Sequence, residues 1–454
     1  MPVSPARAAA FDILLRVERE SSYASDLLHS NTYDSLSTPD HALSTELVMG
    51  VLRWQSSLDE EIAQASSQPL RKLDPEILIA LRLAVYQLRH LTRIPTHAAL
   101  HESVELVKRA KKRSAAPFVN AVLRKLSTKP RLPLCPSVPS VASIDSQALA
   151  AKLSHPEWLV DRWIREYGLT AAGQICQYNQ STPTTTIRLR TPTAEKELEA
   201  EGLVLAPGAF LTSARCIASG DVTKTKPYRQ GDIAIQDEAS QLVAALVSAS
   251  LCNQARILDC CAAPGGKTLA IADHNPSARI TAVELRPHRA RRMKNLFSTA
   301  HAATPIEVLI ADARHLPLRT HFHRILADVP CSGTGTLARN PEIKWRLKPE
   351  DFTELHDRQL AILRAAMAHV LPQGRLIYST CSLEKKENED VVEQALAENK
   401  SFRVLDCRII LEDLKSEGKL SHPDASHLIR GPYLRTIPGL HPCDGFFAAA
   451  LERS

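Results

Sequence analysis

Two cysteines in this 454-residue chain stand in loops that follow predicted strands. Cys331 ends the stretch Asp-Val-Pro-Cys at 328–331, and Cys381 lies in Ser-Thr-Cys-Ser at 379–382. Open parallel sheets build their sites where strands end, and a cysteine placed there acts as a nucleophile if its thiolate is stabilised. The alternative is a buried structural thiol, since free cysteine is among the most buried residue types.

A loop rich in small residues follows the predicted strand at 256–259. Residues 259–268 read Asp-Cys-Cys-Ala-Ala-Pro-Gly-Gly-Lys-Thr, and such residues let a backbone approach a ligand closely with a helix N-terminus behind it. The end of this loop also resembles a phosphate-binding Walker motif. That motif needs glycine where the chain has Cys261, and no acidic magnesium partner follows in the expected form. A nucleoside triphosphatase is therefore disfavoured.

Acidic residues end or follow the next three predicted strands. Glu284 ends the second strand, Asp312 follows the third and Asp328 ends the fourth. In doubly wound folds, an acid at the end of the second strand accepts hydrogen bonds from ribose hydroxyls. Without a GxGxxG pyrophosphate motif, the three acids suit a ligand with a ribose, an adenine and a cationic amino group, as S-adenosylmethionine has. Alternatively, Glu284 and Asp312 cap the helices that follow.

Alternating apolar strands and helices from residue 232 onward predict a mostly parallel sheet covered on both faces. The last strand follows an Asp-Gly turn and is expected to join the edge of the sheet antiparallel. The predicted strands span residues 256–259, 279–284, 306–310, 324–328, 375–379 and 446–451.

The chain before this sheet divides into three parts. Residues 1–128 show helical spacing throughout and predict an all-α domain. Prolines then recur every third residue, which predicts a linker over 129–150. Residues 151–231 mix a helix with short strands and predict a small α/β module ahead of the domain at 232–454.

Positive charge is concentrated in the helical part. Residues 71–131 carry 14 Lys and Arg against 4 Asp and Glu, a net charge of +10, whereas the whole chain carries +6. The excess includes the short run 108–113. A solvated helix face is the alternative for one such run, but the extent of the excess favours binding of a polyanion, most simply nucleic acid.

Other classes of protein are excluded by the composition. No apolar run reaches the roughly 18 residues that a membrane span needs, and Asp12 and Arg16 interrupt the N-terminal apolar stretch, against a signal peptide. Ten cysteines show no paired spacing for zinc. We expect a cytoplasmic protein with reduced thiols and with neither a metal nor a membrane partner.

Five segments closely resemble motifs of the RNA cytosine-C5 methyltransferases: 259–268, 328–335, 341–345, 378–382 and 444–447. Segments 93–100 and 119–124 are similar to the NusB-like domain of the bacterial RsmB/Sun branch of that family. The resemblance implies an α/β Rossmann-like methyltransferase domain that uses S-adenosylmethionine, preceded by a small α/β module that binds RNA and an all-α NusB-like domain. It also implies methylation of a cytosine in 16S rRNA, naked or in an early small-subunit assembly intermediate, by a monomer.

The resemblance assigns the catalytic roles. Carbon 5 of cytosine is too weak a nucleophile to attack a methyl sulfonium, so Cys381 first adds to carbon 6. Cys331 then assists loss of the carbon-5 proton and release of the enzyme. Asp328 and Lys267 contact the base edge where charge develops. Trp345 either stacks on the extruded base or packs in a core.

The resemblance also assigns the cofactor contacts. Glu284 is expected to hold the ribose hydroxyls and Asp312 to face the adenine, whereas Arg289 is as well explained as a surface arginine. The full set is Cys261, Ala262, Ala263, Pro264, Gly265, Gly266, Lys267, Glu284, Arg289, Asp312 and Asp328.

Two other classes of function remain open: a DNA or protein methyltransferase, and an RNA-binding assembly factor without activity. Protein methylation needs no thiolate that attacks a pyrimidine ring, and a pure binder needs neither cysteine. DNA cytosine methyltransferases use a single Pro-Cys cysteine. The paired cysteines therefore favour RNA.

Overall fold

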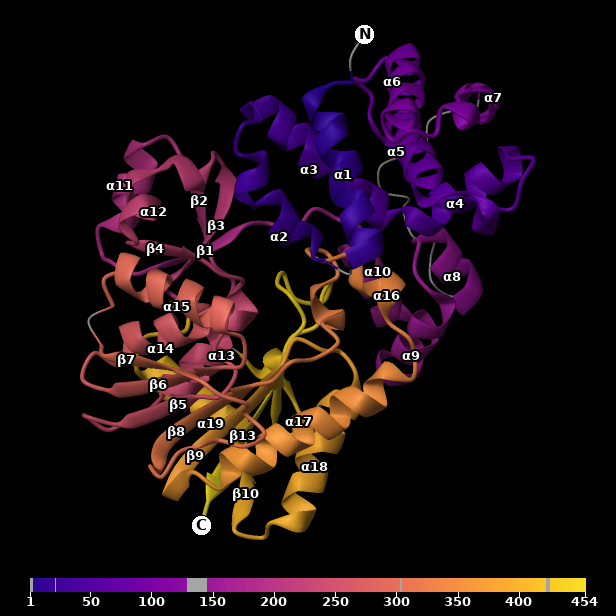
Figure 1. The fold of residues 1–454 in the computed structure, drawn as a ribbon. Coiled ribbons are helices and arrows are strands. Elements are labelled where there is room, and N and C mark those ends of the chain that lie inside the picture. The colour runs from indigo at the N-terminus through magenta and orange to yellow at the C-terminus, as the bar shows by residue number, and fades with distance from the viewer. Residues whose placement is uncertain (1–2, 21, 129–144, 303, 422–424) are drawn as a thin grey trace. The chain divides into compact units, whose positions relative to one another are not determined.

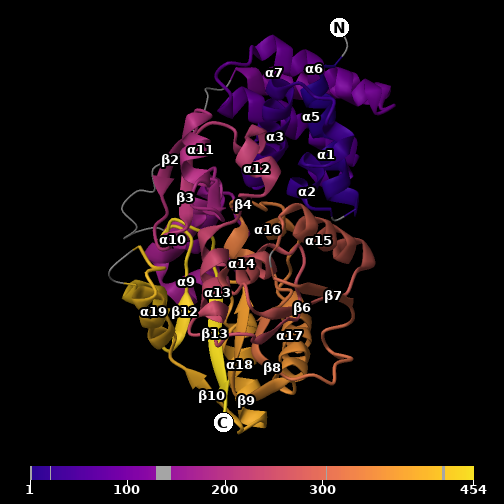
Figure 2. The same cartoon turned by 90° about the vertical axis from the view of Figure 1, so that its left-hand side faces the viewer.

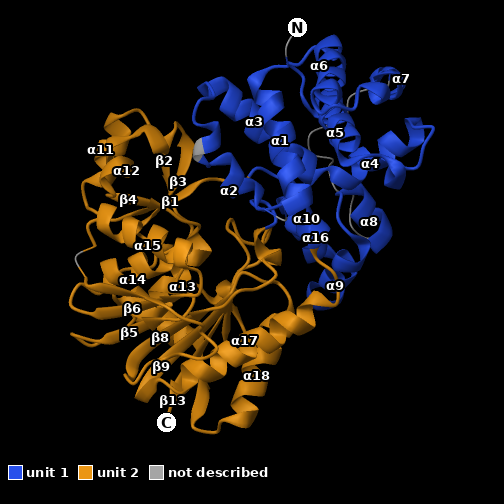
Figure 3. Ribbon diagram, viewed as in Figure 1, with its two compact units in different colours: residues 1–182, 337–346 blue, residues 183–336, 347–454 orange. Residues whose placement is uncertain are grey.

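The computed structural model describes residues 3–20, 22–128, 145–302, 304–421 and 425–454. The chain forms two compact units: residues 1–182 with 337–346, and residues 183–336 with 347–454 (Figure 3). Most of the predicted linker at 129–150 lies outside the described residues. The boundaries between these units differ from the domain boundaries expected from the sequence. The expected domain boundaries stay a prediction.

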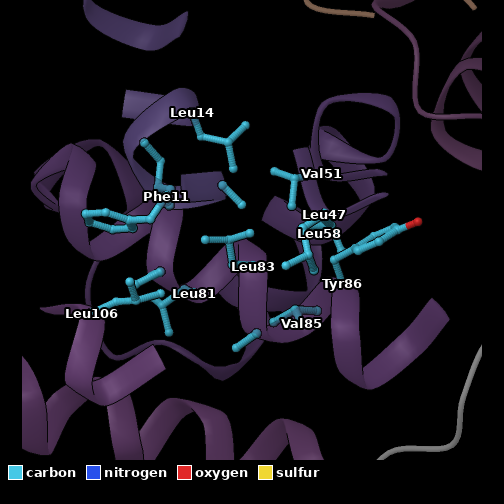
Figure 4. Packing of buried hydrophobic residues seen from close by; sticks show 14 of the residues in the cluster. Phe11, Leu14, Leu47, Val51, Leu58, Leu81, Leu83, Val85, Tyr86 and Leu106 are labelled. Carbon is cyan, nitrogen blue, oxygen red and sulfur yellow. The ribbon is translucent and has the colours of Figure 1, made fainter. Parts of the chain in front are cut away.

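The first unit is helical. Its central helix is α5 (Pro75–His90), in which every residue from Ile79 to His90 is buried. Most of its residues are apolar and need neighbours, and its buried Arg82 and Arg89 pair with acids of a neighbouring helix. Figure 4 shows Leu81 and Leu83 of α5 packed among Phe11, Leu14 and Leu106 of the neighbouring helices. Around α5 lie α1 (Pro5–Glu20), α3 (Thr38–Arg53), α4 (Gln55–Ala65), α6 (Thr96–Arg109) and α7 (Ala116–Ser127).

Residues 337–346 belong to this helical unit although the chain reaches them between two strands of the second. The segment ends in α16 (Ile343–Arg346). Lys344 Nζ donates to the carbonyls of Arg53 (3.0 Å) and Ser154 (2.6 Å), and Trp345 Nε1 donates to the carbonyl of Leu52 (2.6 Å). Trp345 therefore contacts the helical unit, as the packing alternative held, and stacking of its half-buried ring on a base stays a prediction.

The second unit begins with a small antiparallel sheet in the order β2-β3-β1-β4. Arg188 and Arg190, on and just after β1, both pair with Asp273 at 2.7 Å in the following domain. These ion pairs are shielded from solvent and attach the small sheet to the rest of the second unit. The strands are β1 (Thr186–Leu189), β2 (Val204–Pro207), β3 (Ala214–Ser219) and β4 (Ile233–Ile235), with helices α11 (Ala194–Ala200) and α12 (Lys226–Gln230).

The large sheet has the order β11-β12-β13-β9-β8-β5-β6-β7, in which β11 is Ile429–Arg430, and β10 also pairs with β13. The strands from β5 to β9 are parallel, as the sequence predicted. They are β5 (Arg256–Asp259), β6 (Arg279–Glu284), β7 (Ile306–Ile310), β8 (Phe322–Asp328) and β9 (Val370–Thr380).

The last strand, β13 (Phe447–Arg453), pairs antiparallel with β9, as expected. It does not form the edge of the sheet, because β12 (Tyr433–Arg435) and β10 (Phe402–Leu405) pair with its other side. The physical reason is its composition: Phe447 to Leu451 are all buried, and so apolar a strand needs cover along both edges.

Helices cover both faces of the large sheet (Figures 1 and 2). Leu242, Ile271 and Leu411 pack on one face, from α13 (Glu238–Ser248), α14 (Gly266–His274) and α19 (Cys407–Ser416). Leu363 and Val392 pack on the other, from α17 (Asp351–Met367) and α18 (Glu389–Glu398). The strand order reverses between β5 and β8, and ligands of such sheets bind beyond the carboxyl ends at that point.

Candidate active site

The carboxyl ends of β8 and β9 and the start of α14 bring four of the expected residues together. Cys331 and Cys381 approach within 3.2 Å, sulfur to sulfur. Lys267 Nζ lies 2.8 Å from Asp328 Oδ2, and Ser379 Oγ donates to Asp328 Oδ1 at 2.7 Å. Adjacent parallel strands fix this geometry, because Asp328 on β8 is in register with Ser379 on β9.

The charges around the two thiols differ. The hydrogen bond with Cys381, burial and the nearby Glu387 carboxylate raise the pKa of Cys331 well above its ordinary value. Burial lowers the pKa of Lys267, but Asp328 and Cys381 outweigh it, so the net shift is upward and Lys267 stays charged. A cation thus acts on Cys381 and an anion on Cys331. The raised pKa of Cys331 favours the thiol form there.

A glycine contact closes the loop that carries Cys331. Gly335 N donates to the carbonyl of Cys381 at 2.9 Å, and Gly445 N donates to the carbonyl of Gly335 at 2.8 Å. A Cβ on Gly335 would lie 2.1 Å from the oxygen of Gly445. Only glycine allows this approach of backbones, which ties both cysteine loops to the segment before β13.

A cavity of about 410 Å³ lies at the ends of β6 and β7. Cys261, Glu284, Arg289 and Asp312 line it, as expected of cofactor contacts. Residues 262–265 lie in the turn between β5 and α14 instead, where Gly265 adopts a φ of 109°, and Gly266 begins α14. Four of the expected cofactor residues therefore share one cavity, and the residues of this turn do not line it.

The two acidic residues of this cavity also cap local turns, as the alternative interpretation held. Glu284 Oε1 accepts from the amide of Arg286 at 2.7 Å, and Asp312 Oδ1 accepts from the amide of Arg314 at 2.9 Å. The Arg314 guanidinium also pairs with Asp312 and lowers the pKa of that carboxyl to about 2. Within the described chain, Glu284 Oε2 has no hydrogen-bond partner, so Glu284 keeps one free acceptor for a ligand.

Asp259, at the end of β5, is a candidate that the sequence analysis did not single out. Its side chain is 1% exposed, and Oδ2 accepts from Thr268 Oγ1 at 2.7 Å. Its Oδ1 is buried without a hydrogen-bond partner among the residues described, and burial raises the pKa of Asp259 to about 7. A buried acceptor without a donor indicates a place where a ligand supplies one. The sequence signal that could have found Asp259 is its position: it is an acidic residue at the end of the predicted strand 256–259, directly before the loop rich in small residues.

The basic surface of the helical unit is smaller than the sequence count implies. Arg82 pairs with Asp59 at 2.6 Å and Arg89 with Glu61 at 2.8 Å, and both arginines are buried. Within 108–113, three of the five basic residues also pair with acids: Lys108 with Glu105, Arg109 with Asp12 and Lys112 with Asp74. No ion pair forms at Lys111 or Arg113 in the part of the chain that the structure describes. These two are the free cations of the run.

No described helix is long and apolar enough to cross a membrane. Across the described ranges, no group of three or more His, Cys, Asp or Glu side chains has the arrangement of a metal site.

Three family models match the chain. The model of the 16S rRNA methyltransferase RsmB/F matches residues 247–452, and the model of the NusB family matches residues 4–128. The model of the ferredoxin-like domain of RsmF/B-like methyltransferases matches residues 155–220. Together they cover the helical unit, the small module and the large sheet.

Relatives align along the whole chain. The probable ribosomal RNA small subunit methyltransferase B of Bacillus subtilis (strain 168) is 32% identical, with 100% of both chains covered. Ribosomal RNA small subunit methyltransferase B of Vibrio cholerae is 31% identical, with 91% of this chain and 90% of the relative covered.

Solved structures share the fold. The protein titled PH0851 superposes with a TM-score of 0.80 at 22% identity, covering 100% of both chains. NSun6 from Pyrococcus horikoshii superposes with a TM-score of 0.56 at 18% identity, covering 66% of this chain and 98% of that one. At these identities the superpositions establish architecture alone.

Proposed function

Because this chain belongs to the RsmB/F family of 16S rRNA methyltransferases, we propose that it transfers a methyl group from S-adenosylmethionine to carbon 5 of a cytosine in 16S rRNA, through a covalent bond between Cys381 and carbon 6. The observation that carries the proposal is the pair of thiols 3.2 Å apart, with Lys267 acting on one and Glu387 on the other. The substrate is naked rRNA or an early assembly intermediate, and the enzyme acts as a monomer in the cytoplasm.

The first step falls to Cys381. Its thiolate sulfur bonds to carbon 6, and the displaced electron pair moves into the ring, where Lys267 and Asp328 hold the edge that becomes negative. Carbon 5 becomes nucleophilic as a result. When bound, the cofactor would supply an electrophilic methyl group: as carbon 5 bonds to the methyl carbon, the methyl–sulfur bond would break and leave its electron pair on the sulfur, which gives S-adenosylhomocysteine.

Release falls to Cys331. Once Cys381 is bonded to carbon it carries no charge, and the main cause of the raised pKa of Cys331 disappears. Cys331 then loses its proton to solvent and removes the proton from carbon 5. The carbon–hydrogen electron pair restores the ring double bond and expels Cys381 as a thiolate. One proton is released overall, and both cysteines return to their starting states.

The cavity at β6 and β7 fits the cofactor by the chemistry of its donors and acceptors. Glu284 Oε2 is free to accept from ribose hydroxyls, and Asp312 accepts from the adenine amino group. Asp259 is not among the residues that line this cavity but precedes Cys260, which is, and its buried Oδ1 would accept from the cationic amino group of the methionine part. Arg289 lines the cavity from α15 (Pro287–Thr299) and would contact the cofactor there.

The position of methylation is tested with 16S rRNA that carries tritium at carbon 5 of its cytosines. We expect one tritium released into water for each methyl group transferred, because carbon 5 exchanges its hydrogen for the methyl group. A DNA copy of the same sequence should accept no methyl. Methyl transfer without tritium release would place the methyl on another atom, and equal transfer to DNA would overturn the choice of RNA.

Cofactor affinity should depend on pH through Asp259. A cationic ligand amino group favours the ionised carboxylate, whose pKa without ligand is about 7. Binding of S-adenosylhomocysteine, measured by calorimetry, should therefore be roughly tenfold weaker at pH 6 than at pH 8. The Asp259→Asn variant should bind more weakly at pH 8 and show a flat profile. If that variant keeps the wild-type slope, Asp259 does not contact the amino group.

RNA affinity should depend on the two free cations of the helical unit. The Lys111→Ala/Arg113→Ala variant should bind 16S rRNA about tenfold more weakly at 0.1 M salt, and the slope of log K against log salt should fall by roughly 1.5. Filter binding at several salt concentrations measures both quantities. Arg364→Ala is the control, since that arginine already pairs with Glu398 at 2.5 Å. An unchanged slope in the double variant would place the phosphate contacts elsewhere.

A further inference from the structure

One buried carboxylate joins the loops of both cysteines. Glu387 ends the short helix Lys385–Glu387 and is 0% exposed. Its Oε1 accepts from Ser332 N at 2.8 Å and from Gln359 Nε2 at 2.9 Å. Its Oε2 accepts from the hydroxyls of Ser332 and Ser382, each at 2.5 Å. Ser332 directly follows Cys331 and Ser382 directly follows Cys381, so the same side chain fixes both loops.

The neighbouring contacts complete this link. Asn388 accepts from Thr380 Oγ1 at 2.5 Å and donates to the carbonyl of Ser382 at 2.9 Å, and so holds both sides of Cys381. Gln359 Nε2 donates to the carbonyl of Pro330 at 3.0 Å, directly before Cys331. The backbone beside each sulfur therefore depends on the Glu387 and Asn388 pair.

The charge of Glu387 is not balanced by a cation among the residues described. Asp328 pairs with Lys267, and Glu389 pairs with Arg435 at 2.5 Å. Tyr378 donates to the backbone carbonyl of Glu387 at 2.6 Å, and burial raises the pKa of Tyr378 well above its ordinary value, so it stays neutral. A buried carboxylate held by four donors without a cation is costly to the fold, which indicates that its charge has a use.

We propose that Glu387 is a positioning residue that sets the separation of the two sulfurs and keeps Cys331 protonated. The inference rests on the proposed function, because it explains how Cys331 is kept from competing with Cys381 as the nucleophile. Its carboxylate adds to the hydrogen bond and the burial that hold Cys331 protonated, while Lys267 acts on Cys381 from the other side. Glu387 acts on the reaction through the cysteines and touches no substrate.

Two substitutions separate the two roles. Glu387→Gln keeps the shape of the side chain and loses its charge. Its amide oxygen still accepts from Ser332 N and Gln359, and its amide nitrogen faces two hydroxyls that rotate to accept. Glu387→Ala removes all the acceptors and leaves the buried amide of Ser332 without a partner. Glu398→Gln is the matched control, an exposed glutamate on the neighbouring helix α18.

The spacing is tested with phenylarsine oxide, which bridges two thiols only when they are close. Peptide mapping should find the arsenic bridge between Cys331 and Cys381 in wild type, Glu387→Gln and Glu398→Gln, with Cys331→Ala as the background. Bridging should fall at least tenfold in Glu387→Ala. Undiminished bridging in that variant would overturn the positioning role.

The charge is tested by the rate of Cys331 alkylation with iodoacetamide against pH, in a Cys381→Ser background. Adding Glu387→Gln should lower the pKa of the Cys331 thiol, and so speed its alkylation about tenfold at any pH below that pKa. Adding Glu398→Gln should leave the rate unchanged. An unchanged profile would overturn the electrostatic role, and this arm decides the matter even if Glu387→Ala fails to fold. Neither readout uses RNA, so both can succeed while the proposed methylation fails.

Discussion

The Cys381→Ala variant should lose methyl transfer to 16S rRNA by roughly 10⁴-fold or more, a loss typical of removing a nucleophile. Cys331 lies 3.2 Å away in wild type. In the variant its pKa loses the contribution of the Cys381 hydrogen bond, but burial and the Glu387 carboxylate still raise it, so we expect Cys331 to replace the missing nucleophile poorly. The cavity that fits the cofactor contains neither cysteine, so binding of S-adenosylhomocysteine should stay within about twofold of wild type. Single-turnover transfer of labelled methyl and calorimetry measure the two quantities.

The control for this result is Cys252→Ala, which removes an exposed cysteine outside the site. It should transfer methyl at the wild-type rate. Transfer above about 1% of wild type in Cys381→Ala would mean that Cys331 or another group makes the bond to carbon 6. Loss of cofactor binding together with transfer would indicate that the substitution disturbs the fold.

The Cys331→Ala variant should accumulate a protein–RNA adduct that wild type does not. Cys381 can still add to carbon 6 and carbon 5 can still receive the methyl, but the base that removes the carbon-5 proton is missing, so the bond to Cys381 persists. A denaturing gel should show a slowly migrating band that carries the methyl label. Its yield should approach one adduct per enzyme, at least tenfold above wild type.

The double variant Cys331→Ala/Cys381→Ala should show no band, which assigns the bond to Cys381. If Cys331→Ala instead turns over at the wild-type rate without an adduct, another group releases the product. If the adduct forms without methyl label, Cys331 acts before methyl transfer, and the order of steps proposed here is wrong.

The central strands could be predicted from the sequence because each is a short apolar run bounded by turn residues. Strands β5, β6 and β7 begin and end at the predicted residues. Strand β12 was not predicted, because it has only three residues and these are too few to show an alternation of apolar and polar side chains. It forms by pairing with β13. Because β12 was not predicted, β13 was expected at the edge of the sheet.

That Cys331, Cys381 and Asp328 lie together could also be predicted, since strand ends collect such residues at one edge of the sheet, whereas the burial of Glu387 could not. Glu387 stands among charged residues at 385–389, a run that resembles a solvated surface, and its burial follows only from its partners in distant loops. The net charge of residues 71–131 overstated the basic surface at Arg82 and Arg89 for a similar reason, since both are buried and paired with acids. Their acidic partners lie on α4, more than 20 residues away along the chain.

The placement of residues 337–346 has a consequence for how the protein is made. Leu52 and Arg53 leave the ribosome early, but the side chains of Trp345 and Lys344 that cap their carbonyls emerge nearly 300 residues later. The helical unit therefore cannot reach its final packing as an independent nascent domain. Until residue 346 is synthesised the carbonyl of Leu52 lacks the Trp345 donor, and the carbonyl of Arg53 has Gln180 Nε2 (2.9 Å) but not Lys344. Completion of the first unit therefore waits for the strand that carries Asp328 and the loop that carries Cys331.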